Sequence, residues 1–222
     1  MAALIEARGL CKRYGATAAL DNTSFSIEAG RIVGLIGPNG AGKTTALKAI
    51  LGLTPFEGGL SVLGRDPRRE RHELMQDVCF IADVAVLPRW IKVQQVLDMA
   101  DGVHPKFNKG KAQQFLSRTD IPMTAKVKTL SKGMVTQLHL ALVMAIDARL
   151  LVLDEPTIGL DIIYRKEFYS SLLNDYFDEE RTILVTTHQV EEIQNVLTDL
   201  LFINRGRIVL DCSMDEVAER YT

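Results

Sequence analysis

The chain has 222 residues, of which 47% are apolar and 24% charged, and its formal net charge is −2. This charge balance excludes a general electrostatic attraction to nucleic acid or to an anionic membrane surface. Three scattered cysteines, Cys11, Cys79 and Cys212, form no cluster typical of zinc sites. The N-terminus lacks the apolar core of a signal peptide, and no apolar run reaches the roughly 18 residues of a membrane-spanning helix. We expect a soluble chain that meets a membrane only through a partner.

Strands and helices alternate along most of the chain. Residues 4–15 and 22–30 are expected to form antiparallel strands that cap one side of the core. Further strands are expected at 31–36, 77–82, 150–155, 182–187 and 199–204, several of them apolar almost throughout, as in a sheet covered by helices on both faces. Helices are expected at 44–53, 93–100, 109–119, 131–146 and 162–177. The charged stretch 65–73 is interpreted as a solvated helix face.

This order predicts an α/β fold with a mostly parallel sheet, an antiparallel β subdomain and an inserted helical subdomain. We expect a single domain over 1–222. Its core is expected at 1–83 and 147–222, and the helical insertion at 84–146.

The stretch GPNGAGKT fits the pattern G-x-x-x-x-G-K-[ST] at every position and lies between an expected strand and helix. Glycines allow backbone N–H groups to turn toward phosphate oxygens, and the positive end of the helix dipole faces the anion. Lys43 is predicted to reach the β- and γ-phosphates, and Thr44 to offer a hydroxyl to Mg²⁺. The alternative is a chance glycine-rich turn. The predicted nucleotide-binding residues of this loop are Gly37, Pro38, Asn39, Gly40, Ala41, Gly42, Lys43, Thr44 and Thr45.

Two carboxylates end the apolar run LLVLDEP, where ligands bind in an open parallel sheet. Asp154 is predicted to hold Mg²⁺ opposite Thr44. Glu155, which should point the opposite way along the pleat, is predicted to act as general base toward water. His188 ends another apolar strand and is predicted to contact the γ-phosphate and the attacking water. The alternative for Asp154 and Glu155 is a helix cap or turn after a core strand, and the alternative for His188 is a polar strand terminus.

These motifs, together with LSKGM at 130–134 and GLD at 159–161, resemble the ATPase subunit of an ATP-binding cassette (ABC) transporter. The resemblance covers essentially the whole chain and implies a P-loop NTPase core that hydrolyses ATP with Mg²⁺. LSKGM is similar to the family signature LSGGQ and is the discriminating motif. Ser131 and Gly133 would lie at a helix N-terminus and bind the γ-phosphate held by a second ATP-binding subunit, here a second copy of the chain. The alternative is a capped core helix.

The resemblance also assigns residues outside the central motifs. Asp161 would lie along the dimer seam, and Tyr14 would stack on adenine. A strand-end tyrosine packed on the core is the alternative for Tyr14. Lys132 and Met134 depart from the signature. Asp83 stands where the family carries glutamine, so it is predicted to contribute to catalysis as a metal ligand.

The resemblance implies separate transmembrane permease subunits, contacted through the stretch 83–90, which contains Trp90. A small core beneath that connection is the alternative for Trp90. The chain is most similar to cassettes of ABC-2-type exporters, which implies a peripheral protein on the cytoplasmic face of the cell membrane and no nucleic-acid partner. Three alternatives stay open: a slow, nucleotide-gated binding module, an ABC protein acting on ribosomes or DNA, and a P-loop kinase.

Overall fold

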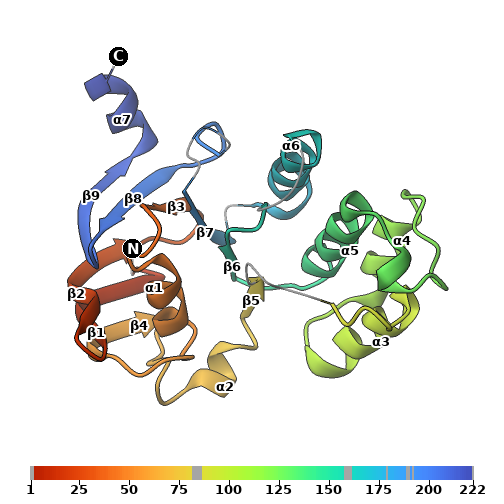
Figure 1. Cartoon of the computed structure of the whole chain (residues 1–222), viewed down its shortest axis with the longest axis horizontal. Helices are drawn as coiled ribbons and strands as arrows, with labels where there is room; N and C mark the ends of the chain where they lie inside the picture. The colour runs from red at the N-terminus through yellow and green to blue at the C-terminus, as the bar shows by residue number, and fades with distance from the viewer. Residues whose placement is uncertain are drawn as a thin grey trace. The chain divides into compact units, whose positions relative to one another are not determined.

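The computed structural model shown in Figure 1 describes residues 3–81, 87–157, 162–178, 180–188, 191 and 193–221. The chain forms two compact units. One contains Met1–Ile81, Arg149–Pro156 and Asp178–Thr222, and the other contains Ala82–Ala148 and Thr157–Phe177. The second unit differs from the expected insertion at 84–146 because it also includes 157–177. The expected division within a single functional domain stays a prediction.

The first unit contains two sheets, as the expected α/β fold requires. A three-stranded antiparallel sheet has the order β2-β1-β4, formed by β1 (Ile5–Tyr14), β2 (Thr17–Ile27) and β4 (Glu57–Val62). A six-stranded sheet has the order β5-β6-β7-β3-β8-β9. Its strands are β3 (Ile32–Ile36), β5 (Val78–Ile81), β6 (Leu150–Asp154), β7 (Thr182–Thr187), β8 (Asp199–Asn204) and β9 (Arg207–Ser213). Among the described strand pairs of this sheet, β8–β9 is antiparallel and the others are parallel.

The central strands of the larger sheet explain why several sequence runs are apolar almost throughout. Every residue of β3, β6 and β7 is buried, because both faces of these strands are covered. The α-helices that the structure describes in this unit are α1 (Lys43–Ile50), α2 (Arg71–Leu74) and α7 (Met214–Tyr221). Burial raises the pKa of the Cys79 thiol on β5 to about 12, so this cysteine is a packing residue and not a nucleophile.

The expectation of a helix over the charged stretch 65–73 is wrong in extent, since only α2 is helical there. The reason is a local turn, in which the Asp66 carboxylate accepts the backbone N–H of Arg68 at 3.0 Å. The guanidinium of Arg68 binds the carboxylate of Asp66 and lies 4.6 Å from the ring centroid of Phe56. The same ion pair lowers the pKa of Asp66, chiefly through the hydrogen bond from Arg68.

The second unit is helical. It contains α3 (Val93–Val103), α4 (Lys109–Leu116), a short 3₁₀ helix (Val127–Thr129), α5 (Lys132–Met144), α6 (Ile162–Ser171) and a π-helical turn (Leu172–Tyr176). A hydrophobic core shared by α3, α4 and α5 holds Val96, Leu97, Leu116 and Leu138. A continuous helix is expected at 162–177, but the α-helix ends at Ser171 and a π-helical turn follows it.

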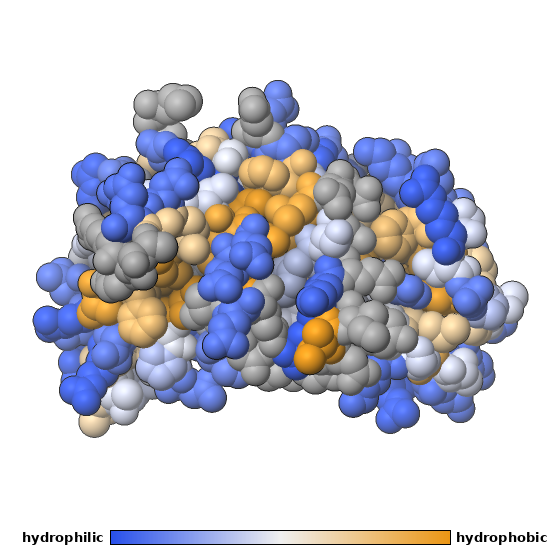
Figure 2. All heavy atoms as spheres, turned by 90° about the horizontal axis from the view of Figure 1, so that it is seen from above, coloured by the Kyte–Doolittle hydropathy of each residue, from blue (hydrophilic) through white to orange (hydrophobic). Residues whose placement is uncertain are grey.

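Among these helices, none within the described ranges is long and apolar enough to cross a membrane. Figure 2 shows one face of the molecule, on which hydrophilic side chains alternate with patches of apolar ones. Large apolar side chains that are exposed include Trp90, Val103, Ile162 and Val209. The Trp90 side chain is 71% exposed, which argues against the alternative of a small core beneath its connection.

Candidate functional site

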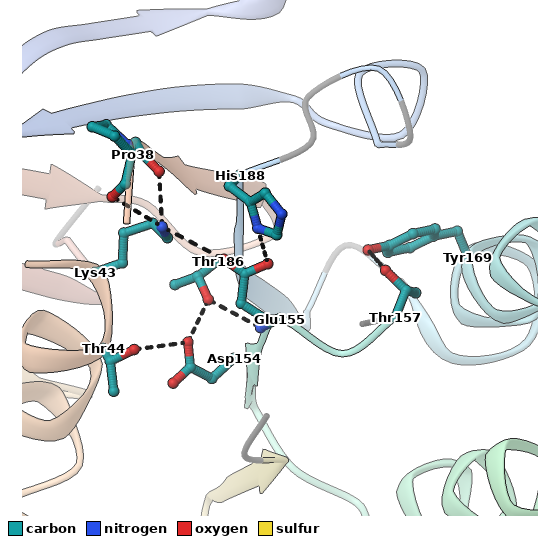
Figure 3. Close-up of polar contacts among 10 residues, drawn as sticks. Pro38, Lys43, Thr44, Asp154, Glu155, Thr157, Tyr169, Thr186 and His188 are labelled. Carbon is teal, nitrogen blue, oxygen red and sulfur yellow. Dashed lines mark hydrogen bonds and ion pairs between the residues drawn. The ribbon is translucent and has the colours of Figure 1, made fainter. Parts of the chain in front are cut away.

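The glycine-rich loop is folded around the ammonium group of Lys43. Lys43 Nζ donates to the carbonyl oxygens of Gly37 at 2.8 Å and Pro38 at 3.4 Å, as Figure 3 shows, and the lysine is 6% exposed. The Ala41 N–H closes the turn on the Pro38 carbonyl at 3.1 Å. The carbonyl of Ala41 in turn accepts from the N–H of Gly206 at 2.8 Å. The loop is therefore held by its own lysine and by the turn between β8 and β9.

Helix α1 begins directly after this loop. Gly42 precedes the helix with φ +113°, in the left-handed region that favours glycine. The unpaired N–H groups of the first helical turn and the dipole of α1 make this end attractive to an anion. A strand, a glycine loop and a helix follow one another here as the phosphate-loop pattern predicts.

Asp154 lies opposite α1, at the carboxyl end of β6, and is 4% exposed. Its Oδ1 accepts a hydrogen bond from Thr44 Oγ1 at 3.3 Å and from Thr186 Oγ1 at 2.6 Å (Figure 3). Within the described part of the chain, Asp154 Oδ2 receives no hydrogen bond. The Asp154 carboxylate and the Thr44 hydroxyl are the hard oxygen donors that Mg²⁺ prefers, so these residues fit the ion. The described residues contain no cluster of three or more His, Cys, Asp or Glu side chains.

The Glu155 carboxylate faces the side chains of Lys43 and His188, which come from other elements (Figure 3). Its Oε1 lies 3.5 Å from Lys43 Nζ, and its Oε2 lies 2.9 Å from His188 Nδ1. The expectation that Glu155 continues the pleat is wrong, because β6 ends at Asp154 and Glu155 has φ +48°. Its N–H instead bonds to the carbonyl and the hydroxyl of Thr186, at 3.2 and 3.1 Å. This turn directs the carboxylate toward Lys43 and His188.

Tyr14 ends β1 and its side chain is half-exposed, so it is not packed in the core. Hydrogen bonding with Thr54, then with Thr45, lowers the pKa of its hydroxyl, and Lys12 contributes. Because Thr45 belongs to the predicted phosphate loop, Tyr14 lies beside that loop. Lys12 Nζ lies 5.0 Å from the centroid of the ring.

In the helical unit, Ser131 caps α5. Its Oγ accepts a hydrogen bond from the N–H of Met134 at 3.2 Å. Ser131 is exposed and Gly133, in the first turn, is buried. The capped-helix alternative is therefore correct as geometry. It leaves the hydroxyl proton of Ser131 free of the cap, because the cap uses the oxygen as acceptor.

The structure brings together Lys43, Thr44, Asp154, Glu155 and His188. Asp83 and Asp161, also expected at the site, lie outside the described residues. Sequence reasoning missed Thr186, which contacts both carboxylate residues. Its only signal was its place in the run TTH at the end of a strand.

Known proteins resemble this chain both in sequence and in fold. The family model described as ABC transporter matches residues 20–158. Nod factor export ATP-binding protein I of Burkholderia lata is 34% identical, over 93% of this chain and 70% of the relative. ABC transporter ATP-binding protein YtrB of Bacillus subtilis is 29% identical, over 98% and 75%. A solved ATP-binding subunit of an ABC transporter has a TM-score of 0.84 at 23% identity, covering 98% of this chain and 93% of that one. This last likeness shows the fold.

Proposed function

Because this chain belongs to the ABC transporter family, as an ATP-binding subunit with transport-coupled ATPase activity, we propose that two such subunits close head to tail around two Mg-ATP and drive separate membrane-spanning subunits. The observation that carries the proposal is the convergence of Lys43, Asp154, Glu155 and His188 at the carboxyl ends of the parallel strands β3, β6 and β7.

The phosphate loop supplies the binding step. With ATP present, Lys43 Nζ would exchange the carbonyls of Gly37 and Pro38 for oxygens of the β- and γ-phosphates. The N–H groups at the start of α1 would face the same phosphates. Thr44 and Asp154 would hold Mg²⁺, which when bound neutralises charge that develops on the phosphates. Tyr14 would stack on the adenine ring.

Glu155 and His188 supply the hydrolytic step. Glu155 would accept a proton from the attacking water. At the same time, the water oxygen would bond to the γ-phosphorus, and the bond between the γ-phosphorus and ADP would break. His188 Nδ1, 2.9 Å from Glu155 Oε2, would fix the orientation of that carboxylate. The ring would also hydrogen-bond the γ-phosphate. Water, rather than a metabolite hydroxyl, suits this base.

The helical unit supplies the contact to the second subunit. Ser131 uses its oxygen to cap α5, so its hydroxyl proton and the N-terminus of the helix can be offered together to a γ-phosphate across a dimer seam. Asp83 and Asp161 would complete the site as a metal ligand and a seam residue. Exposed Trp90 would contact a membrane-spanning subunit.

We propose export, at the cytoplasmic face of the cell membrane, as the direction of transport. The relatives that support it include Nod factor export protein I and daunorubicin resistance ATP-binding protein DrrA3 of Streptomyces coeruleorubidus, 31% identical to this chain. We propose no nucleic-acid partner, because the net charge of −2 gives no electrostatic basis for one.

The solution mass of the Glu155→Gln variant, with and without Mg-ATP, tests the sandwich. Loss of the base should trap two subunits around uncleaved ATP, so the mass should double with Mg-ATP. Adding Ser131→Asp keeps a side chain that caps helices well but places a carboxylate against the γ-phosphate, so the dimer should disappear. Adding Ser131→Asn keeps the cap without the charge and should preserve the dimer. A monomer with bound Mg-ATP in Glu155→Gln would contradict the self-assembled sandwich.

A further inference from the structure

Thr186 touches both carboxylate residues of the site. It lies near the end of β7, is fully buried, and stands directly opposite Asp154 in the parallel pairing of β6 with β7. Its hydroxyl donates to Asp154 Oδ1 at 2.6 Å and accepts from the N–H of Glu155 at 3.1 Å. A single hydroxyl group therefore connects the predicted metal ligand to the backbone of the predicted base.

The hydrogen bond from the Thr186 hydroxyl to Asp154 determines which carboxylate oxygen of Asp154 stays available to a metal ion. Two hydroxyls, of Thr186 and Thr44, converge on Oδ1. No described residue donates to Oδ2. The carboxylate plane is held by the shorter of the two bonds, because the Thr44 contact is 3.3 Å long and its hydroxyl is itself suited to a cation. Without the Thr186 hydroxyl, the one donor to Asp154 Oδ1 left among the described residues would be Thr44, the weaker and competing partner.

The hydrogen bond from the Glu155 N–H to the Thr186 hydroxyl stabilises the turn at Glu155. This residue has φ +48°, a region that residues with a side chain adopt rarely. Thr186 receives the Glu155 N–H on its carbonyl and on its hydroxyl. The turn directs the Glu155 carboxylate toward His188 and Lys43, at 2.9 and 3.5 Å. The Thr186 hydroxyl therefore supports the conformation that aims the base.

We propose that Thr186 is a positioning residue for ATP hydrolysis, which holds Asp154 for the metal and Glu155 for water at the same time. This inference rests on the roles proposed above for the two carboxylates. The plain alternative is a core threonine whose hydroxyl only satisfies buried neighbours. If Thr186 is a positioning residue, loss of its hydroxyl should change metal dependence and turnover. If it is a plain core threonine, the loss should change stability alone.

Three variants separate them. Thr186→Val removes the hydroxyl and keeps the branched shape, and Thr186→Ser keeps the hydroxyl. Thr182→Val is the matched control, because Thr182 is on the same strand, is fully buried, and its hydroxyl bonds the N–H of Gly30 at 3.0 Å, with no bond to a site carboxylate. For each variant we would measure ATP hydrolysis, the affinity for ATP in EDTA and in Mg²⁺, and equilibrium unfolding in urea.

Thr186→Val should lower turnover about 10- to 100-fold, as for partners of metal ligands elsewhere. It should also reduce the gain in ATP affinity that Mg²⁺ gives, while ATP affinity in EDTA stays unchanged. Thr186→Ser should restore most of both. Thr182→Val should lower stability to a similar degree and leave turnover and the Mg²⁺ effect unchanged.

The proposal is overturned if Thr186→Val and Thr182→Val behave alike, or if Thr186→Ser is no better than Thr186→Val. Asp154→Asn distinguishes this failure from failure of the underlying roles. If Asp154→Asn leaves the Mg²⁺ effect on ATP affinity intact, the metal role of Asp154 is itself wrong.

Discussion

His188 Nδ1 lies 2.9 Å from Oε2 of Glu155, although the two residues are 33 positions apart in the sequence. They meet because β6 and β7 are parallel neighbours, and each residue directly follows the end of its strand. Such a pair suits a carboxylate base with an oriented side chain. The predictions below begin with this pair.

Glu155→Gln should lower ATP turnover by about 10² to 10⁴, the contribution typical of a general base. The amide keeps the size of the side chain but cannot accept the proton of water. ATP affinity should stay close to wild type, because Lys43 and the loop N–H groups are unchanged. Phosphate release and binding of a fluorescent ATP analogue would check both values. Unchanged turnover would mean that another group accepts the proton.

His188→Ala should lower turnover about 10²-fold, as loss of one preorganised hydrogen-bonding group does. His188→Asn should retain more activity, because its amide nitrogen can take the position of Nδ1 next to Glu155. The ratio of the two turnover numbers is the measurement. Equal losses would show that the bond to Glu155 is not what the histidine contributes.

Tyr14→Ala should weaken ATP binding by about 1–3 kcal/mol, the value of one base stacked on an aromatic ring. Tyr14→Phe keeps the ring and loses only the hydroxyl near Thr54 and Thr45, so its ATP affinity should stay near wild type. Equilibrium titration with ATP would separate the two. An equal loss in both variants would assign the effect to the hydroxyl.

Gly42→Ala should damage the phosphate loop more than Gly40→Ala. Both glycines have positive φ, but a Cβ at Gly42 would lie 2.4 Å from the carbonyl oxygen of Ala19, whereas a Cβ at Gly40 meets no atom within 4 Å. Gly40→Ala should therefore cost about 1–2 kcal/mol from the backbone alone. Gly42→Ala should cost more and weaken ATP binding. Urea unfolding and ATP titration of both variants would test this ranking.

His139 on α5 should make stability fall in mild acid. Burial lowers the pKa of its imidazole, so the unfolded chain takes up a proton first as the pH falls below about 6.5. Its contribution to stability is full above that pH and is lost toward the lowered pKa of the folded state. His139→Leu should reduce the drop in unfolding free energy between about pH 7.5 and about pH 5.5.

If His139→Leu shows the same drop as wild type, other groups cause the acid sensitivity.

Apolar patterning predicts the centre of the fold well and its margins less well. The five short runs expected as strands are β3, β5, β6, β7 and β8, because burial on both faces selects continuous apolar sequence. Strands β4 and β9 were missed. The first contains Gly58 and Gly59, which weaken a strand pattern, and in the second, Cys212 is buried while the other residues are half-buried or exposed.

Motif spacing predicts which residues gather at the site, but not how two of them are held. The sequence places Asp154 and Glu155 at a strand end, yet the left-handed turn at Glu155 depends on a partner from β7. No local propensity of Thr186 indicates that its hydroxyl connects both residues. Such contacts depend on the register between strands, which a single sequence does not specify.

The turn that joins β8 to β9 has a consequence for how the protein is made. The N–H of Gly206 supports the phosphate loop at Ala41, and the loop follows β3, which pairs with β7 and β8. A ribosome synthesises the loop early and these supports late. A nascent chain that ends before Gly206 therefore carries the motif without the frame that shapes it. ATP should first become bound when the last strands have left the exit tunnel.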